Sequence, residues 1–128
     1  MNIPDSLRYT DQHEWIKVDG NIGTVGVTDF AQNSLSDMTY VELPEVGRDV
    51  KKGDELAAIE SCKAAASIYA AVAGSVTEVN EELESDPGLI NTDPYGGGWI
   101  CKIEIADEAE LETLLTAEQY APLCQQEG

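Results

Sequence analysis

The chain has 128 residues, of which 42% are hydrophobic and 25% are charged, a balance typical of one packed domain and not of a disordered chain. Its 25 acidic residues outnumber the 7 basic ones, and the net charge of −18 disfavours a role in binding nucleic-acid phosphates or anionic membrane surfaces. No apolar run is long enough to span a bilayer, and residues 1–5 show no basic secretory leader, although a transit peptide removed earlier would leave no trace.

The first half of the chain is predicted to form short strands separated by turns. Residues 14–18 and 22–27 are expected to pair as a hairpin, because the dipeptide Asp19-Gly20 between them favours a tight turn. Thr28 follows at a position that can cap a short helix. Further strands, separated by residues with turn chemistry, are expected at 38–43, 56–59 and 68–72.

The second half continues this pattern up to about residue 105. A turn at Gly74 is predicted to precede a strand over residues 76–79. The segments 86–88 and 93–98 contain Pro and Gly and are expected to be loops. Apolar residues alternate with polar ones over 99–105, which predicts a half-buried strand there.

The C-terminus is expected to add two short helices between residues 107 and 124. Each helix is expected to begin with a capping pair: Asp107 with Glu110, and Thr116 with Gln119. Many short strands without long helices favour a mainly β fold of two antiparallel sheets, either a sandwich or a flattened barrel. The whole chain, 1–128, is therefore interpreted as one domain with its core at about residues 7–105.

The residue patterns of hydrolytic, phosphate-binding and metal-binding sites are missing from the chain. His13 is the sole histidine, and no G-x-S-x-G nucleophile turn accompanies it, so a structural role is the simpler interpretation. The glycines at 96–98 lack the Lys-Ser/Thr of a phosphate loop, and the acidic residues at 81–86 lack calcium-loop spacing. The three cysteines form no CxxC pair, which favours free thiols in a reducing compartment.

The segment Glu60-Ser61-Cys62-Lys63-Ala64 connects two expected strands and places Lys63 near the middle of the connection. Small neighbours leave the lysine amine open to a modifying enzyme, and the flanking strands define where the tip stands. Acylation of such an amine would remove its charge and turn the side chain into a tether. On this pattern alone, an unmodified turn lysine is the simpler interpretation.

This segment resembles the lipoyl attachment box of the glycine cleavage H proteins, and the resemblance extends from about residue 7 to about residue 120. Segments similar to those of H proteins follow in the same order: His13-Glu14-Trp15, Thr28-Asp29-Phe30-Ala31-Gln32, Val41-Glu42-Leu43-Pro44-Glu45-Val46-Gly47, Gly53-Asp54, Glu78-Val79-Asn80, Leu89-Ile90-Asn91-Thr92-Asp93-Pro94-Tyr95 and Gly98-Trp99. Ordered and spaced matches of this kind are far more specific than the lysine box alone.

The resemblance implies a barrel-sandwich hybrid fold and a covalent lipoate on the ε-nitrogen of Lys63. It implies a carrier, not an enzyme, that takes the aminomethyl group from glycine decarboxylase (P protein) to aminomethyltransferase (T protein). Dihydrolipoyl dehydrogenase (L protein) would reoxidise the arm, and a lipoate ligase or lipoyltransferase would attach it. A monomer in the bacterial cytoplasm is expected, or in the mitochondrial matrix if a transit peptide has been removed.

Several residues depart from the family pattern near the cleft that holds the loaded arm. Phe30 stands where the family usually has His, Cys62 where it commonly has Val, and Ala66-Ser67 where it has Ser-Asp. Glu14 matches a family cleft residue and is the candidate arm-docking residue. Cys62 is interpreted as a small residue that fits a tight turn, with redox activity as the alternative.

Four other functions stay open at this point. The departures leave room for an H-like lipoyl protein that relays lipoyl groups or serves sulfur metabolism. A biotin domain is disfavoured because it would place Met on both sides of the lysine, where Cys62 and Ala64 stand here. The segments matching H proteins also disfavour a carrier domain of a 2-oxo-acid dehydrogenase. A stand-alone thiol enzyme that uses Cys62 is disfavoured because no usable histidine lies near it in the sequence.

Overall fold

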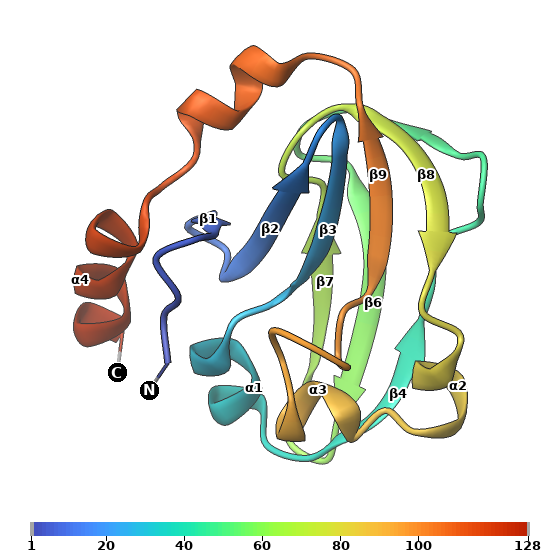
Figure 1. Cartoon of the computed structure of the whole chain (residues 1–128). Helices are drawn as coiled ribbons and strands as arrows, with labels where there is room; N and C mark the ends of the chain where they lie inside the picture. Colours follow the sequence, from blue (N-terminus) through green and yellow to red (C-terminus); the bar gives the residue numbers. More distant parts are fainter. Residues whose placement is uncertain (1, 128) are drawn as a thin grey trace.

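The computed structural model describes residues 2–127, and its strands form two antiparallel sheets that pack against each other (Figure 1). In the larger sheet the order is β1-β2-β3-β9-β8-β5, with β1 (Arg8–Tyr9), β2 (Glu14–Asp19), β3 (Ile22–Val27), β5 (Asp49–Val50), β8 (Gly74–Val79) and β9 (Cys101–Ile105). In the smaller sheet the order is β4-β6-β7, with β4 (Met38–Glu42), β6 (Glu55–Ser61) and β7 (Ala65–Tyr69). The expected mainly β fold of two antiparallel sheets is confirmed.

Short helices cover the ends of this sandwich. They are α1 (Asp29–Leu35), α2 (Glu82–Ser85), α3 (Leu89–Thr92), the 3-10 helix η1 (Glu108–Thr113) and α4 (Ala117–Glu127). Figure 1 shows α1, α2 and α3 at the lower end of the molecule, where the turn between β6 and β7 also lies. Helix α4 lies at the side of the sandwich, beside β1.

Two of the predicted helix caps are confirmed. The hydroxyl oxygen of Thr28 accepts a hydrogen bond from the backbone N–H of Ala31 at 3.3 Å and so caps α1. Thr116 and Gln119 form the reciprocal capping box of α4, because each backbone N–H donates to the other residue's side chain, at 3.0 and 3.2 Å.

The prediction that Asp107 and Glu110 form a capping pair is confirmed for Asp107 and wrong for Glu110. Asp107 does cap η1, by accepting a hydrogen bond from the backbone N–H of Ala109 at 3.0 Å. The carboxylate of Glu110 instead accepts a hydrogen bond from the backbone N–H of Ala73 at 2.8 Å. Glu110 therefore joins η1 to the loop before β8, and the segment forms a 3-10 helix where an ordinary helix was expected.

The strand expected at 68–72 and the turn expected at Gly74 are both misplaced in the sequence prediction. The strand is β7, which begins at Ala65 and ends at Tyr69. Gly74 is the first residue of β8, and a Cβ atom there would overlap the backbone carbonyl oxygen of Glu104 on β9. This glycine therefore allows two strands to approach closely and does not form a turn.

The prediction contains no counterpart of β1, β5, α2 or α3. Each of these elements has four residues or fewer. An element of that length is too short to show a helical or strand periodicity, so only its tertiary contacts stabilise it.

Aliphatic side chains fill the space between the two sheets. Ile16, Val25 and Ile103 of the larger sheet and Leu56 and Ile59 of the smaller sheet are all at most 2% exposed. This composition agrees with the low aromatic content of the chain, which is 6%. Burial of such side chains contributes about 1.5–3 kcal/mol each and is the main stabilising term for the sandwich.

A second hydrophobic cluster joins α4 to the sandwich and is rich in aromatic rings. The rings of Tyr9 on β1 and Tyr120 on α4 stack with centroids 4.7 Å apart. The Tyr120 hydroxyl forms hydrogen bonds of 2.7 Å with the Thr28 hydroxyl and with Nδ1 of His13. His13 thus takes part in the contact between α4 and the N-terminus of α1, as its structural interpretation requires.

Candidate functional site

The hairpin of β6 and β7 places Lys63 in its turn, between the two strands of the smaller sheet. Ser61, the last residue of β6, closes the turn because its side-chain oxygen accepts hydrogen bonds from the N–H groups of Lys63 and Ala64, at 3.2 and 3.0 Å. The N–H of Ser61 also donates to the carbonyl oxygen of Ala64 at 2.8 Å. One serine therefore organises the turn, and the exposed Ala64 leaves space beside the lysine.

Further hydrogen bonds attach this turn to the segment between α1 and β4. The N–H of Cys62 donates to the carbonyl oxygen of Asp37 at 3.0 Å, and the Cys62 thiol lies 3.7 Å from the Ser36 hydroxyl. Asn91 on α3 holds the same segment, because its side chain donates to the Ser36 carbonyl and accepts from the Met38 N–H, both at 2.9 Å. Sequence reasoning missed this role of Asn91, although its motif was among the segments that resemble H proteins.

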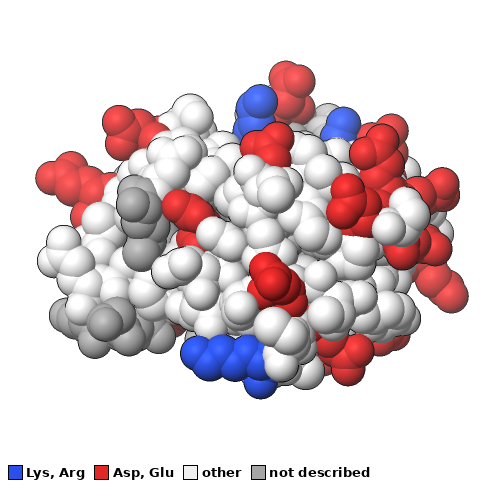
Figure 2. Space-filling view, turned by 90° about the horizontal axis from the view of Figure 1, so that it is seen from below, with Lys and Arg blue, Asp and Glu red and all other residues white. Residues whose placement is uncertain are grey.

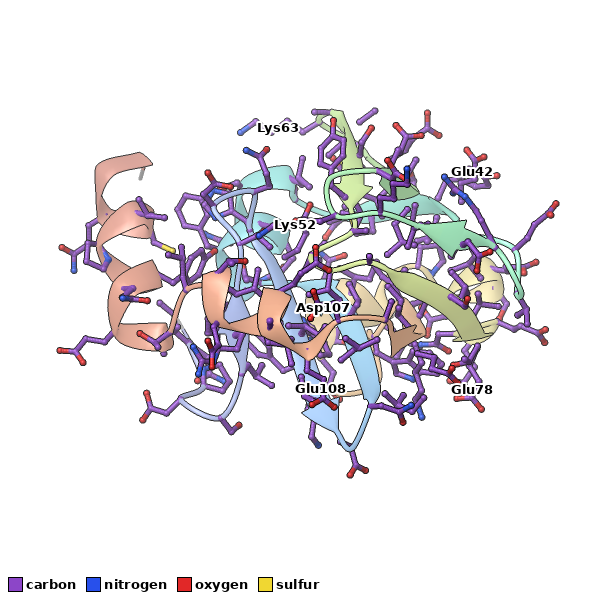
Figure 3. All side chains as sticks on the ribbon, turned by 90° about the horizontal axis from the view of Figure 1, so that it is seen from above. Glu42, Lys52, Lys63, Glu78, Asp107 and Glu108 are labelled. Atoms are coloured by element: carbon purple, nitrogen blue, oxygen red, sulfur yellow. The ribbon has the colours of Figure 1, made fainter. Side chains whose placement is uncertain are left out.

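Lys63 is exposed, and Figure 3 shows its side chain pointing away from the body of the molecule. Among the described side chains, none forms an ion pair with its amine. Glu60 is also exposed, and its carbonyl oxygen accepts a hydrogen bond from the Thr39 hydroxyl at 3.2 Å. The geometry thus presents a primary amine on a well-held turn, where an acyl-transferring enzyme can reach it.

Glu14 lies on β2 beneath the other end of the hairpin and is only 1% exposed. One of its carboxylate oxygens accepts a hydrogen bond from the N–H of Tyr69 at 2.9 Å, and the other accepts one from the Thr10 hydroxyl at 2.7 Å. Burial raises the pKa of Glu14 to about 7, because loss of water outweighs the two hydrogen bonds that lower it. Since Tyr69 ends β7, Glu14 connects the lysine hairpin to the larger sheet.

A cavity of about 330 Å³ lies between β7 and α1, and we call it the β7 cavity. Its lining is mainly apolar and includes His13, Phe30, Leu35, Ala66 and Ser67. Three of the departures from the family pattern therefore meet here. Phe30 packs on the His13 ring with centroids 4.6 Å apart, so two aromatic rings form this wall of the cavity.

The cysteines form no disulfide in the structure. Cys62 is exposed, whereas Cys101 and Cys124 are buried. Burial raises the pKa of Cys101 to about 12, which keeps this thiol protonated. Among the side chains that the structure describes, those of residues 2–125, no three His, Cys, Asp or Glu side chains gather where they could hold a metal ion. In the same range, no helix has the length and apolar character that crossing a bilayer requires.

Comparison with known proteins agrees with this geometry. Residues 7–127 match the glycine cleavage H-protein family. The glycine cleavage system H protein of Carboxydothermus hydrogenoformans is 54% identical over 126 residues, which cover 98% of this chain and 97% of that protein. The H protein of Thermotoga maritima is 53% identical over 120 residues, which cover 94% of this chain and 97% of that protein.

A solved structure supports the same assignment. The crystal structure of a glycine cleavage system H protein from Mycobacterium marinum has a TM-score of 0.86 and 36% identity to this chain, and the match covers 98% of this chain and 100% of that one. Both the sequence and the fold are thus shared over nearly the whole length. The chain belongs to the glycine cleavage H-protein family, the non-catalytic lipoyl carriers of the glycine cleavage system.

Proposed function

We propose that Lys63 is the lipoylated residue of this chain and that its arm serves the glycine cleavage enzymes in turn. The observation that supports this most directly is an exposed amine on a turn closed by Ser61. The residues fit the cofactor, because the Lys63 amine has no ion pair among the described side chains and its neighbours Cys62 and Ala64 are small. An amide at this nitrogen would therefore break no described ion pair.

The residues of this chain supply position, and the cofactor supplies the redox chemistry. When bound, lipoate provides a reducible disulfide at the end of a flexible chain, which accepts the aminomethyl group. Ser61 and Asn91 hold the turn from which the lysine stem swings, and Glu14 holds the base of the hairpin through Tyr69. A fixed starting point keeps the arm at a high effective concentration beside each docked enzyme.

Glu14 is proposed to contribute to docking of the arm as well. It fixes the end of β7, the strand that forms one wall of the β7 cavity. Glu14 is not among the described residues that line this cavity. We infer that it acts on the arm through the position of β7, while residues such as Phe30 and Ser67 form the surface that the arm would meet.

We infer that the P, T and L proteins act in turn on the arm that Lys63 carries and that a lipoate ligase or lipoyltransferase attaches it. The net charge of −18 favours partners that present basic surfaces. The chain is proposed to act as a monomer in the bacterial cytoplasm. The bacterial origin of its relatives supports this location over an organelle.

Replacing Lys63 with Arg tests the assignment of the modified residue. Arginine keeps the charge on an exposed turn, so the free energy of unfolding should stay within about 0.5 kcal/mol of wild type. A guanidinium does not form the lipoyl amide, so incubation with lipoate ligase, ATP and lipoate should add one lipoyl group to wild type and none to Lys63→Arg. Glycine cleavage reconstituted with P, T and L proteins should fall to background.

Lys51→Arg is the matched control, because Lys51 is an exposed lysine at the far end of the hairpin from Lys63. This control should accept lipoate and support turnover as wild type does. Intact-mass measurement with peptide mapping checks both variants. Lipoylation of Lys63→Arg, or turnover well above background with it, would disprove the assignment.

A further inference from the structure

The smaller sheet has an exposed face next to the Lys63 turn. The outward-pointing residues of its three strands form what we call the outer sheet face: Tyr40, Glu42, Ala58, Glu60, Ala65 and Ser67. The strand register places Tyr40, Glu60 and Ala65 in the row nearest the turn. A hollow of about 270 Å³ crosses this row and the next, and all six residues line it.

Tyr40 is the most prominent feature of this face. Its side chain is 52% exposed, whereas the adjacent Val41 points into the core and is 4% exposed. Ala58 and Ala65 are small, so they form a low floor beside the tyrosine ring. An exposed aromatic side chain at the border of a shallow hollow is typical of the anchor residues of protein interfaces.

The charge of this face determines which kind of partner fits it. Glu42 and Glu60 border the first hollow, and a second hollow of about 260 Å³ continues from Glu42 and adds Glu45 and Glu55. Arg48 is the only basic side chain among the described residues that line the two hollows. An arginine of a partner could stack on the aromatic anchor and pair with a glutamate, so a basic protein surface fits best.

The figures agree with this arrangement. Figure 3 shows Glu42 and Lys63 on the same side of the molecule, with the Lys63 side chain projecting from its edge. Figure 2 looks at the end of the molecule that carries the hairpin turn, and acidic side chains outnumber basic ones on it. A basic partner is therefore attracted toward the region of the turn.

Of the proposed partners, the enzyme that attaches lipoate must contact the protein nearest to the Lys63 turn. This inference rests on the proposed role of Lys63. In that reaction the Lys63 amine attacks the activated carboxyl carbon of a lipoyl acyl phosphate. The amide bond forms, the bond from the carbonyl carbon to the phosphate oxygen breaks, and the phosphate leaves with that electron pair. The proton that the amine loses passes to solvent. The reacting carbon must reach the amine itself, so this enzyme must contact the protein directly beside the turn.

The other partners meet this chain after the arm has been attached. They can engage the dithiolane at the full length of the arm and need not touch the turn. On its inner side the turn contacts the segment at Ser36 and Asp37, through Cys62. The outer sheet face is the side of the hairpin that this segment leaves open.

We propose that the lipoylating enzyme docks a basic surface on the outer sheet face, with Tyr40 as the anchor and Glu42 and Glu60 as charge partners. The outer sheet face and the Lys63 turn together would form the surface by which this enzyme recognises the unmodified chain.

The kinetics of lipoylation test this proposal with purified lipoate–protein ligase, lipoate and ATP, measured by intact mass on the full chain. Tyr40→Thr, which keeps a strand-forming residue, should lower kcat/KM at least about tenfold, mainly through KM. Glu42→Gln should weaken the dependence of kcat/KM on salt concentration. Val18→Thr, at an exposed strand position of the larger sheet, is the matched control and should stay within about twofold of wild type.

The outcomes separate the two proposals. Failure of wild type to take up lipoate would refute the role of Lys63, whereas wild-type lipoylation with an unchanged kcat/KM for Tyr40→Thr would overturn the docking proposal alone. Tyr40→Thr that has been fully lipoylated by long incubation should support glycine decarboxylation by P protein at the wild-type rate. An equal loss there would assign the face to P protein and overturn our choice of occupant.

Folding of the variants is checked separately. Urea unfolding should place Tyr40→Thr and Val18→Thr close to wild type, because the two side chains are 52% and 39% exposed and lie outside the core. If Tyr40→Thr does not fold, Glu42→Lys provides the same test, because it reverses a charge at an exposed position of the outer sheet face. A wild-type kcat/KM for Glu42→Lys would overturn the docking proposal.

Discussion

Glu14→Gln tests the buried carboxyl group that connects β2 to the lysine hairpin. Burial raises the pKa of Glu14 from 4.5 to about 7, so the folded chain holds this proton more tightly than the unfolded chain does. The stability that protonated Glu14 contributes is complete below pH 4.5 and is lost as pH rises through about 7. The full loss is about 3 kcal/mol, of which about 2 to 3 kcal/mol falls between pH 5 and pH 8.

Glutamine has the same shape and lacks this titration. Its amide oxygen can still accept the hydrogen bond from the Tyr69 N–H, so the variant is expected to fold. Urea unfolding of both proteins from pH 5 to pH 8 should show Glu14→Gln gaining about 2 to 3 kcal/mol relative to wild type as pH rises.

A control is needed because the chain has 25 acidic residues, and many of them affect the pH dependence of stability. Glu118→Gln removes one carboxylate from an exposed position of α4 and should give a curve parallel to that of wild type. Parallel curves for wild type and Glu14→Gln would refute the reasoning, because they would mean that Glu14 loses little solvation on folding.

Two further substitutions test the packing that supports the site. Gly74→Ala should destabilise the chain by about 3 kcal/mol or more, because its Cβ would overlap a backbone carbonyl of β9, whereas Gly88→Ala, with 3.4 Å to its nearest neighbour, should cost far less. Tyr120→Phe should cost about 1 to 3 kcal/mol, because it removes the hydroxyl shared with Thr28 and His13. Urea unfolding measures both, and a wild-type midpoint for either variant would contradict the contact concerned.

The departures from the family pattern affect the β7 cavity and leave the hydrogen bonds of the lysine turn intact. Phe30 packs against His13, and the Ser67 hydroxyl donates to Glu55 at 2.8 Å. The turn itself depends on Ser61, together with the bond from Cys62 to Asp37, which uses only backbone atoms. If Lys63 carries lipoate as proposed, changes at the β7 cavity should therefore affect handling of the arm without affecting its attachment.

Turns and helix caps that involve residues close together in the chain could be predicted from the sequence. The hairpin around Asp19-Gly20, the cap at Thr28 and the capping box of Thr116 with Gln119 each involve residues a few positions apart, and all are present in the structure. The place of Lys63 between two strands follows from the same kind of signal, since small polar residues there interrupt two apolar runs. The segments that resemble H proteins then indicated the family.

Contacts between residues that are far apart in the sequence could not be predicted in this way. Glu14 meets Tyr69, Asn91 supports the lysine turn through Ser36, and Gly74 lies against β9, in each case across many positions of the chain. Such pairs form because the two sheets bring their strands together, and a residue's own neighbours carry no information about that approach. Local chemistry thus set the turn that presents the amine, while long-range packing determined how firmly that turn is held and which face beside it stays open.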